Sequence, residues 1–233
     1  MIVRASRTRY GDVMHDEWLA RWRDGKIGFH EGRPNDLLAR HLARLARARR
    51  VLVPLCGKTE DLAFLAANDH EVVGIELAEQ AVSAFFAEHG LAPAISQRGP
   101  FTAYTAGAIT LLAGDVFAAT AELLGPVDAL YDRAALVALP DTLRPSYAAL
   151  LRRLLPPGAP GLVITFEYDQ RAAAGPPFAV LEAELRALYP DAAIDLVEER
   201  VASGLPRCAE AGVSAIERCF AIRSGPAATM GPA

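Results

Sequence analysis

Residues 51–76 read VLVPLCGKTEDLAFLAANDHEVVGIE, and this stretch decides the fold. It opens on the apolar run VLVPL, continues through the helical segment EDLAFLAANDH and closes on a second apolar run, EVVGIE. Two strands joined through one helix form a βαβ unit, whose crossover requires parallel pairing and buried strands. The stretch therefore predicts an α/β domain built around a parallel sheet.

The alternation of helices and strands continues on both sides of this unit. On the N-terminal side, PNDLLARHLARLARARR carries leucines at helical spacing behind Asn35, a residue type that caps helices. On the C-terminal side we expect, in order, a helix in AEQAVSAFFAEHG, strands in AITLLAGDVF and VDALYD, a helix in RPSYAALLRRLLPPG, a strand in GLVITFEY, a helix in FAVLEAELRALYP and an antiparallel pair, AIDLVEERV with AIERCFAIR. Residues 98–107 have no readable pattern.

This order predicts one doubly wound domain over residues 1–223. Residues 1–34 would form an N-terminal arm or lid, and residues 224–233, rich in glycine, alanine and proline, a disordered tail. In such a sheet, ligands bind at the carboxyl ends of the strands, where the winding reverses. The functional site is therefore expected in the loops that follow the strands.

The composition excludes several classes of partner. Of 233 residues, 52% are hydrophobic and 22% charged, and the formal net charge is -4. This balance gives no electrostatic attraction for nucleic acid or an anionic membrane, and no segment has the length of a membrane span or the pattern of a signal peptide. Three scattered cysteines indicate reduced thiols rather than disulfides or metal ligands. We expect a cytoplasmic monomer that acts on a small molecule and holds no metal.

The first loop, residues 54–59, ends in Gly-Lys-Thr but is not a phosphate-binding loop. A Walker A motif needs a glycine five positions before Gly57, where this chain has Leu52. Glu76 ends the second strand, the position at which an acid accepts hydrogen bonds from ribose hydroxyls in nucleotide-binding sheets. NAD would need the three glycines of GxGxxG, whereas S-adenosylmethionine has no phosphate and needs fewer. The residues thus favour S-adenosylmethionine.

Four segments, taken in order, resemble the thiopurine S-methyltransferase family: WLARWRDGKIGFHEGRPNDLLARHL, VLVPLCGKTEDLAFLAANDHEVVGIELAEQAVSAFF, LYDRAALVALP and GPPF. The resemblance extends from Trp18 to about Phe178, and the combination of IGFH, PLCGK and VVGIE is specific to the family. It implies a Rossmann-like class I methyltransferase fold with a mostly parallel seven-stranded sheet and an antiparallel strand near the C-terminus. It also implies S-adenosylmethionine as cofactor and S-adenosylhomocysteine as product.

The resemblance also implies which residues contact the cofactor. They are Trp18 or Trp22, Leu55, Glu76, Asp115 with Val116, and Arg133, to which we add Gly57 from the loop whose amides face the crevice. Asp115 departs from the small or polar residues of some relatives. Its carboxylate could bind the adenine amino group or cap a helix.

Methyl transfer from a sulfonium requires alignment and exclusion of water more than a metal or a covalent nucleophile. Asp132 and Arg133 end a strand over the predicted crevice, and we expect them at the catalytic centre, with the Arg133 guanidinium pairing either the cofactor carboxylate or an anionic substrate. The alternative is that Arg133 forms a structural salt bridge with Asp132 or Glu76.

The N-terminal arm supplies the remaining candidates. Phe29 and His30 are expected to contact the substrate, and the two tryptophans to form a lid or an anchor to the core. Cys56 is expected to be a small buried side chain rather than a nucleophile.

The leading hypothesis is methyl transfer to a thiopurine-type or other small thiol, or to a selenium or tellurium compound. Halide or thiocyanate methylation is a second possibility. A third is an adenosine-ligand-binding protein without catalysis.

Overall fold

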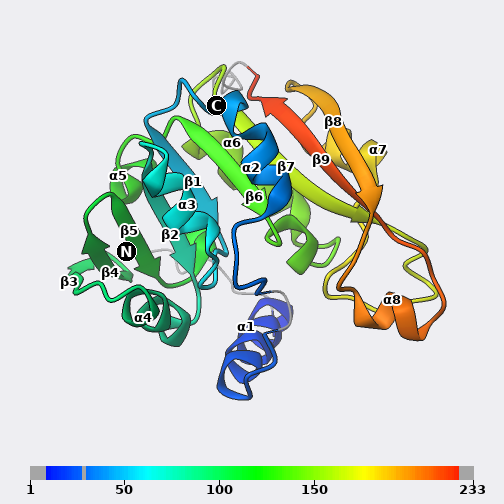
Figure 1. Ribbon diagram of the computed structural model, residues 1–233, viewed down its shortest axis with the longest axis horizontal. Helices are drawn as coiled ribbons and strands as arrows, with labels where there is room; N and C mark the ends of the chain where they lie inside the picture. The colour runs from blue at the N-terminus through cyan, green and yellow to red at the C-terminus, as the bar shows by residue number, and fades with distance from the viewer. Residues whose placement is uncertain (1–8, 28–29, 226–233) are drawn as a thin grey trace.

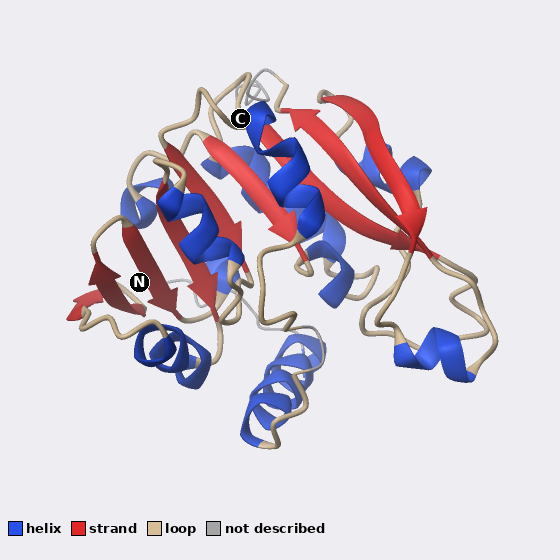
Figure 2. Ribbon diagram, viewed as in Figure 1, coloured by secondary structure: helices blue, strands red, loops and turns tan. Residues whose placement is uncertain are grey.

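The computed structural model describes residues 9–27 and 30–225, which form a nine-stranded mixed sheet with helices on both faces (Figures 1 and 2). The strands are β1 (Arg50–Pro54), β2 (Glu71–Glu76), β3 (Ala94–Arg98), β4 (Phe101–Ala106), β5 (Ile109–Ala113), β6 (Ala129–Arg133), β7 (Pro160–Glu167), β8 (Ala193–Val201) and β9 (Ile216–Arg223). The helices are α1 (Arg9–Arg23), α2 (Asp36–His41), α3 (Asp61–Ala67), α4 (Glu79–Glu88), α5 (Ala121–Leu124), α6 (Arg144–Leu154), α7 (Glu182–Leu188) and α8 (Pro206–Glu210). Short 3-10 helices cover Leu42–Arg44, Val116–Ala118 and Leu136–Ala138.

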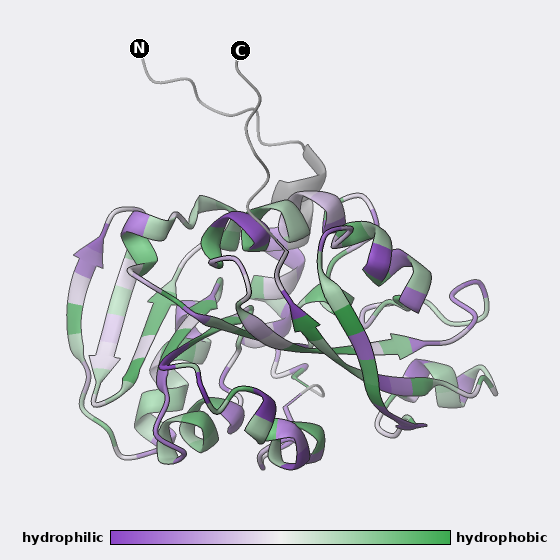
Figure 3. Cartoon of the chain, turned by 90° about the horizontal axis from the view of Figure 1, so that it is seen from above, coloured by the Kyte–Doolittle hydropathy of each residue, from purple (hydrophilic) through white to green (hydrophobic). Residues whose placement is uncertain are grey.

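The βαβ unit is present as the sequence predicts. β1 and β2 pair in parallel with Val51 opposite Val72. β1 side chains alternate between two hydrophobic cores: Leu52 belongs to one, while Val51 and Val53 belong to the other. The first core is closed by α6 and α7, the second by α2, α3 and α4. Figure 3 shows the inner strands largely in the hydrophobic colour, and nearly all residues of β1, β2, β5 and β6 are buried, as central parallel strands require.

The prediction of seven mostly parallel strands is wrong in the number of strands and in the share of parallel pairings. The strand order is β3-β4-β5-β2-β1-β6-β7-β9-β8, with four parallel pairings at the centre and four antiparallel pairings toward the two edges. Residues 98–107, which have no readable pattern, belong largely to a β3–β4 hairpin that turns at Gly99. Most of β3 is exposed, including Ile95, and an edge strand without a buried face has no apolar alternation to reveal it. The predicted antiparallel pair at the C-terminus is confirmed as β8 with β9.

The helix expected after residue 34 is shorter than its leucine pattern indicates. Asn35 is its N-cap, as predicted, because the Asn35 side chain accepts hydrogen bonds from the backbone N–H groups of Leu37 and Leu38. The α-helix ends at His41, and a 3-10 turn carries the chain on to β1. Within the residues that the structure describes, no helix has the length and apolar character to cross a membrane.

The carboxyl ends of β1, β2, β5 and β6 point toward one edge of the sheet, and α1 and α8 lie beyond that edge (Figure 1). The loop after β1 is held against β2, since Cys56 N–H donates to the Ile75 carbonyl at 3.0 Å. Gly74 makes this close approach possible: a Cβ at that position would lie 2.5 Å from Leu111 Cδ2 and 2.8 Å from Cys56 Sγ.

We therefore expect Gly74→Ala to lower the free energy of unfolding by about 1 to 3 kcal/mol, because the added methyl group overpacks the contact between loop and strand. Urea unfolding measures the loss. Adding Cys56→Ala to this variant should recover part of it, since the sulfur is one of the two atoms in the way. Strictly additive losses in the double variant would contradict this account of Gly74.

Candidate active site

A cavity of about 1190 Å³ opens at the carboxyl edge of the sheet. Its walls come from the loops after β1, β2, β5 and β6, from α1 on one side and from the segments around α8 on the other. The cavity thus lies at the strand ends, where the sequence predicts the functional site. Cavities that hold one drug-sized ligand measure roughly 300–1,000 Å³, so this one has room for a cofactor and an acceptor together.

The loop between β1 and α3 contains two left-handed residues, and the second, Gly57, is not among the residues that line the cavity. Leu55 has a φ of 47° and Gly57 a φ of 54°. Glycine adopts this region freely, whereas leucine does so at a cost, and such strained positions cluster at functional sites. Leu55 lines the cavity. Lys58 also lines it, and its Nζ contacts Glu88 Oε1 at 2.5 Å.

Glu76 joins this loop to the start of α4. Its Oε2 accepts a hydrogen bond from Gly57 N–H and its Oε1 from Ala78 N–H, both at 2.8 Å. The side chain is buried and lines the cavity. Burial raises the pKa of the Glu76 carboxyl, and the hydrogen bonds that it accepts from backbone N–H groups counteract that rise. Each carboxylate oxygen has two lone pairs, so Glu76 retains acceptor capacity toward a ligand in the cavity.

Asp115 caps the 3-10 helix Val116–Ala118, since its Oδ1 accepts from Phe117 N–H at 2.9 Å. Its Oδ2 lies 3.7 Å from His15 Nε2 on α1. The capping alternative is therefore confirmed for one oxygen. Asp115 and the buried Val116 both line the cavity, beside Gly114, which directly follows β5.

Arg133 and Asp132 have different surroundings although they are neighbours at the end of β6. The Arg133 guanidinium lines the cavity and pairs with Glu31 Oε1 at 2.5 Å, rather than with Asp132 or Glu76. Asp132 is fully buried and is not among the cavity-lining residues. Its oxygens accept from Leu136 N–H at 3.0 Å and from the Tyr147 hydroxyl at 2.8 Å, and burial raises its pKa to about 6.

The arm contributes both tryptophans to the cavity wall. Trp22 is buried and packs with Ala78 and Ala81 at the start of α4, which anchors α1 to the domain. Trp18 is half-buried, with the Arg21 guanidinium 5.3 Å from its ring centroid.

His30 is half-buried in the same wall, where burial and the nearby Lys58 lower its pKa. Phe29, the other predicted substrate residue, lies outside the described residues. Cys56 borders the cavity but is buried, as predicted, and burial raises its thiol pKa well above the usual range, which disfavours a nucleophilic thiolate.

Glu31, Asp61 and Tyr131 are among the cavity residues that the sequence reasoning missed. Asp61 is buried at the start of α3 and accepts from the Tyr131 hydroxyl at 2.9 Å. Burial raises its pKa, and hydrogen bonds offset part of the rise. An acid in the first turn of a helix is common for electrostatic reasons alone, so its sequence position carried no specific signal. In the ranges 9–27 and 30–225, no group of three or more His, Cys, Asp or Glu side chains forms a metal site.

Comparison with known proteins supplies the family. The model of the thiopurine S-methyltransferase family matches residues 13–223. The thiopurine S-methyltransferase of Pseudomonas aeruginosa (strain UCBPP-PA14) is 53% identical over 176 residues, which cover 75% of this chain and 81% of that protein. That of Pseudomonas putida is 44% identical over 214 residues, covering 88% and 97%.

Solved structures agree on the fold. The 1,6-didemethyltoxoflavin-N1-methyltransferase of Burkholderia thailandensis, with bound 1,6-didemethyltoxoflavin and S-adenosylhomocysteine, has a TM-score of 0.64 at 20% identity and covers 96% of this chain and 93% of its own. A TehB-like S-adenosylmethionine-dependent methyltransferase of Corynebacterium glutamicum has a TM-score of 0.51 at 14% identity and covers 92% and 99%. With the family match over nearly the whole length, this chain belongs to the thiopurine S-methyltransferase family and is an S-adenosylmethionine-dependent methyltransferase.

Proposed function

We propose that the protein transfers the methyl group of S-adenosylmethionine to a soft nucleophile: a thiopurine-type or other small thiol, or a selenium or tellurium compound. The observation that carries the proposal is Glu76: a buried carboxylate with spare acceptor capacity, fixed by Gly57 and Ala78 at the end of β2 and facing the cavity. An acid in this position suits the two ribose hydroxyls of an adenosine ligand.

The residues around Glu76 fit the rest of the cofactor. Leu55 and Gly57 offer the turned backbone of the first loop, and Asp115 with Val116 form the side of an adenine slot. Trp18 and Trp22 place aromatic faces in the wall, and aromatic faces attract cations such as a sulfonium. Bound there, the cofactor would supply an electrophilic methyl group. The protein would align it and exclude water.

Arg133 and His30 mark the side from which the acceptor approaches. The planar guanidinium of Arg133 suits a carboxylate of the cofactor or an anionic acceptor. His30, whose pKa is lowered, is neutral near pH 7 and can accept a hydrogen bond from a thiol. Phe29 remains a proposed acceptor contact. Because thiols ionise near neutral pH, no stronger base is required.

The cavity favours an organic acceptor over a halide. Beyond the strand ends its walls include Leu139, Leu143, Phe166, Pro176 and Pro177, which offer apolar surface to a ring. A halide or thiocyanate ion would need a small, dry pocket that surrounds it. The family match also gives no support to a binding protein without catalysis.

Two finer parts of the proposal concern regions away from the chemistry. Asp132 acts as a positioning residue that fixes the end of β6, rather than as a group in contact with substrate.

The catalytic domain comprises residues 1–223, with residues 1–34 as a lid and 224–233 as a tail. The protein works as a monomer in the cytoplasm. Exposed large apolar side chains are spread over α1, β3, β8 and two loops, which supports the monomer.

A screen of methyl acceptors with labelled S-adenosylmethionine tests the function directly. We expect transfer to 6-mercaptopurine or a related thiol, to selenite or to tellurite, in preference to iodide. Methylation of iodide alone would favour the halide alternative. Absence of transfer to every acceptor, with the cofactor bound, would overturn the proposed acceptor class.

Glu76→Ala should weaken S-adenosylhomocysteine binding by about 1 to 3 kcal/mol, because two ribose hydroxyls lose a charged acceptor. Calorimetry on the folded variant measures this. Glu71→Ala is the matched control, since Glu71 begins the same strand at the opposite edge and pairs with Arg49 there. Equal affinities for the two variants would remove Glu76 from the cofactor site.

Arg133→Lys should lower turnover about tenfold, equivalent to ~1.4 kcal/mol in the activation barrier, because a point charge replaces a planar fork poorly. The thermal midpoint should move little by comparison. Arg40→Lys, in an Arg–Glu pair outside the cavity, serves as control. A loss of stability as large as the loss of activity would identify Arg133 as a structural residue.

Asp132 should make stability depend on pH. Its folded pKa of about 6 exceeds the value near 3.9 of an unfolded aspartate, so the folded state binds the proton more tightly. The resulting stabilisation is complete below about pH 4 and is lost as pH rises through about 6. Relative to the unsubstituted protein, Asp132→Asn should therefore gain up to about 3 kcal/mol of stability between pH 4 and 7. Parallel curves of unfolding free energy against pH would show that Asp132 has no such shift.

A further inference from the structure

Asn35 is a buried junction between the arm and the cavity. It is 1% exposed, and all of its polar groups are committed to hydrogen bonds, including the backbone carbonyl, which accepts from Ala39 N–H at 3.0 Å. Its Oδ1 caps α2 by accepting from Leu37 N–H at 3.0 Å and Leu38 N–H at 3.4 Å. Its backbone N–H donates to Asp61 Oδ1 at 2.6 Å, and its side-chain amide donates to Glu31, with both carboxylate oxygens at 3.3 Å.

Both acids that contact Asn35 lead to the same strand. Asp61 Oδ2 accepts from the Tyr131 hydroxyl at 2.9 Å, and Glu31 Oε1 accepts from the Arg133 guanidinium at 2.5 Å. Tyr131 and Arg133 are two residues apart on β6, so their side chains leave the strand on the same face. The five residues thus form a closed ring through the β6 backbone, which we name the β6 ring.

The β6 ring belongs to the wall of the active site. Four of its members line the cavity, and Asn35 lies behind them. Arginine has a long side chain with many rotamers, and a guanidinium recognises a planar group only when its fork is held in the right plane. Glu31 is itself held by the Asn35 amide, so the carboxylate that orients Arg133 is fixed in turn. Such a supporting contact orients a binding group before the ligand arrives.

We propose that Glu31 is a positioning residue that orients the Arg133 guanidinium toward the ligand, and that Asn35 keeps Glu31 in place. This inference rests on the proposed role of Arg133 in ligand binding. It assigns the arm a function besides covering the cavity, because Glu31 of the arm, held by Asn35, sets the geometry of a side chain on β6.

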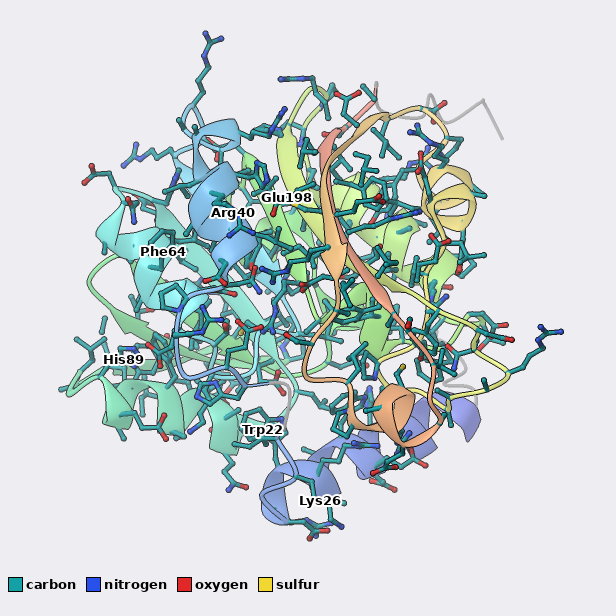
Figure 4. The ribbon with its side chains drawn as sticks, turned by 45° about the vertical axis from the view of Figure 1, so that its right-hand side comes forward. Trp22, Lys26, Arg40, Phe64, His89 and Glu198 are labelled. Atoms are coloured by element: carbon teal, nitrogen blue, oxygen red, sulfur yellow. The ribbon has the colours of Figure 1, made fainter. Side chains whose placement is uncertain are left out.

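The first test is Glu31→Gln in the full chain. Glutamine keeps the size and one acceptor oxygen but loses the charge, so we expect kcat/KM to fall about tenfold, within the ~100-fold that a displacement of 1 Å can cause. Glu198→Gln is the matched control: Glu198 pairs with Arg40 at 2.6 Å, is similarly exposed (27% against 30% for Glu31), and lies outside the cavity. Figure 4 shows this pair on α2 and β8, apart from Trp22 and Lys26 of the arm.

A double-mutant cycle shows whether Glu31 acts through Arg133. In the Arg133→Lys background, Glu31→Gln should change kcat/KM by less than about twofold, because the group that Glu31 orients is gone. A tenfold effect in both backgrounds would mean that Glu31 acts independently, and would overturn the proposal. If Arg133→Lys alone leaves turnover unchanged, the failure lies in the proposed role of Arg133 and not in the coupling.

Asn35→Ser tests the second half of the proposal without a new charge. Serine caps helices about as well as asparagine, and the backbone N–H to Asp61 is kept, but the short side chain cannot reach Glu31. We expect Asn35→Ser to lower kcat/KM about as much as Glu31→Gln does. Its thermal midpoint should stay close to that of the control, Glu198→Gln. Tighter binding of S-adenosylhomocysteine by Glu31→Gln or Asn35→Ser would identify Glu31 as a competitor for the guanidinium, and would overturn its positioning role.

Discussion

The Glu76 carboxylate ties the first loop of the sheet to the second strand, and the arrangement of the site depends on this contact. One oxygen accepts from Gly57 and the other from Ala78, so a single side chain fixes both the loop after β1 and the start of α4. A buried carboxylate is tolerated only when such donors compensate for lost hydration. Ala78 packs in turn against Trp22, so the same contact also places the arm. The Glu76 carboxylate therefore helps to place three elements of the cavity: the loop after β1, the start of α4 and the arm.

The parts of this arrangement that were predictable are encoded locally. The two apolar runs of the βαβ unit, the cap at Asn35 and the acid at the end of β2 can each be recognised within a few residues, because strand burial, capping and strand-end position are properties of short segments. Cys56 was predictable for a similar reason, since an apolar loop pressed onto a strand has no place for an ionised thiol.

The remaining parts depend on contacts between distant residues. Glu31 and Arg133 are separated by 102 positions, and Asp61 and Tyr131 by 70. The sequence around each residue therefore gives no indication of its partner. Asp132 was the nearer candidate for Arg133, but its oxygens are taken by Leu136 and Tyr147 on the buried side of the strand. The β3–β4 hairpin was missed because its outer strand has no buried face to impose a pattern.

Buried acids have the same structural task at several points of this edge. Glu76, Asp61 and Asp132 each accept from two separate parts of the chain, and burial raises the pKa of each. The carboxyl edge of a parallel sheet consists of loops that diverge, and a carboxylate can bridge two of them while exposing acceptor capacity to a ligand. Because methyl transfer gains most from alignment, we expect the rigidity that these bridges give to the loops to contribute to catalysis. If Glu76 and Asp115 hold the cofactor as proposed, their carboxylates also suit a cationic donor, whereas the apolar side chains of Leu139, Leu143 and Phe166 in the same cavity suit the ring of a thiopurine-type acceptor. The cavity wall thus offers the two kinds of surface that the two proposed reactants need.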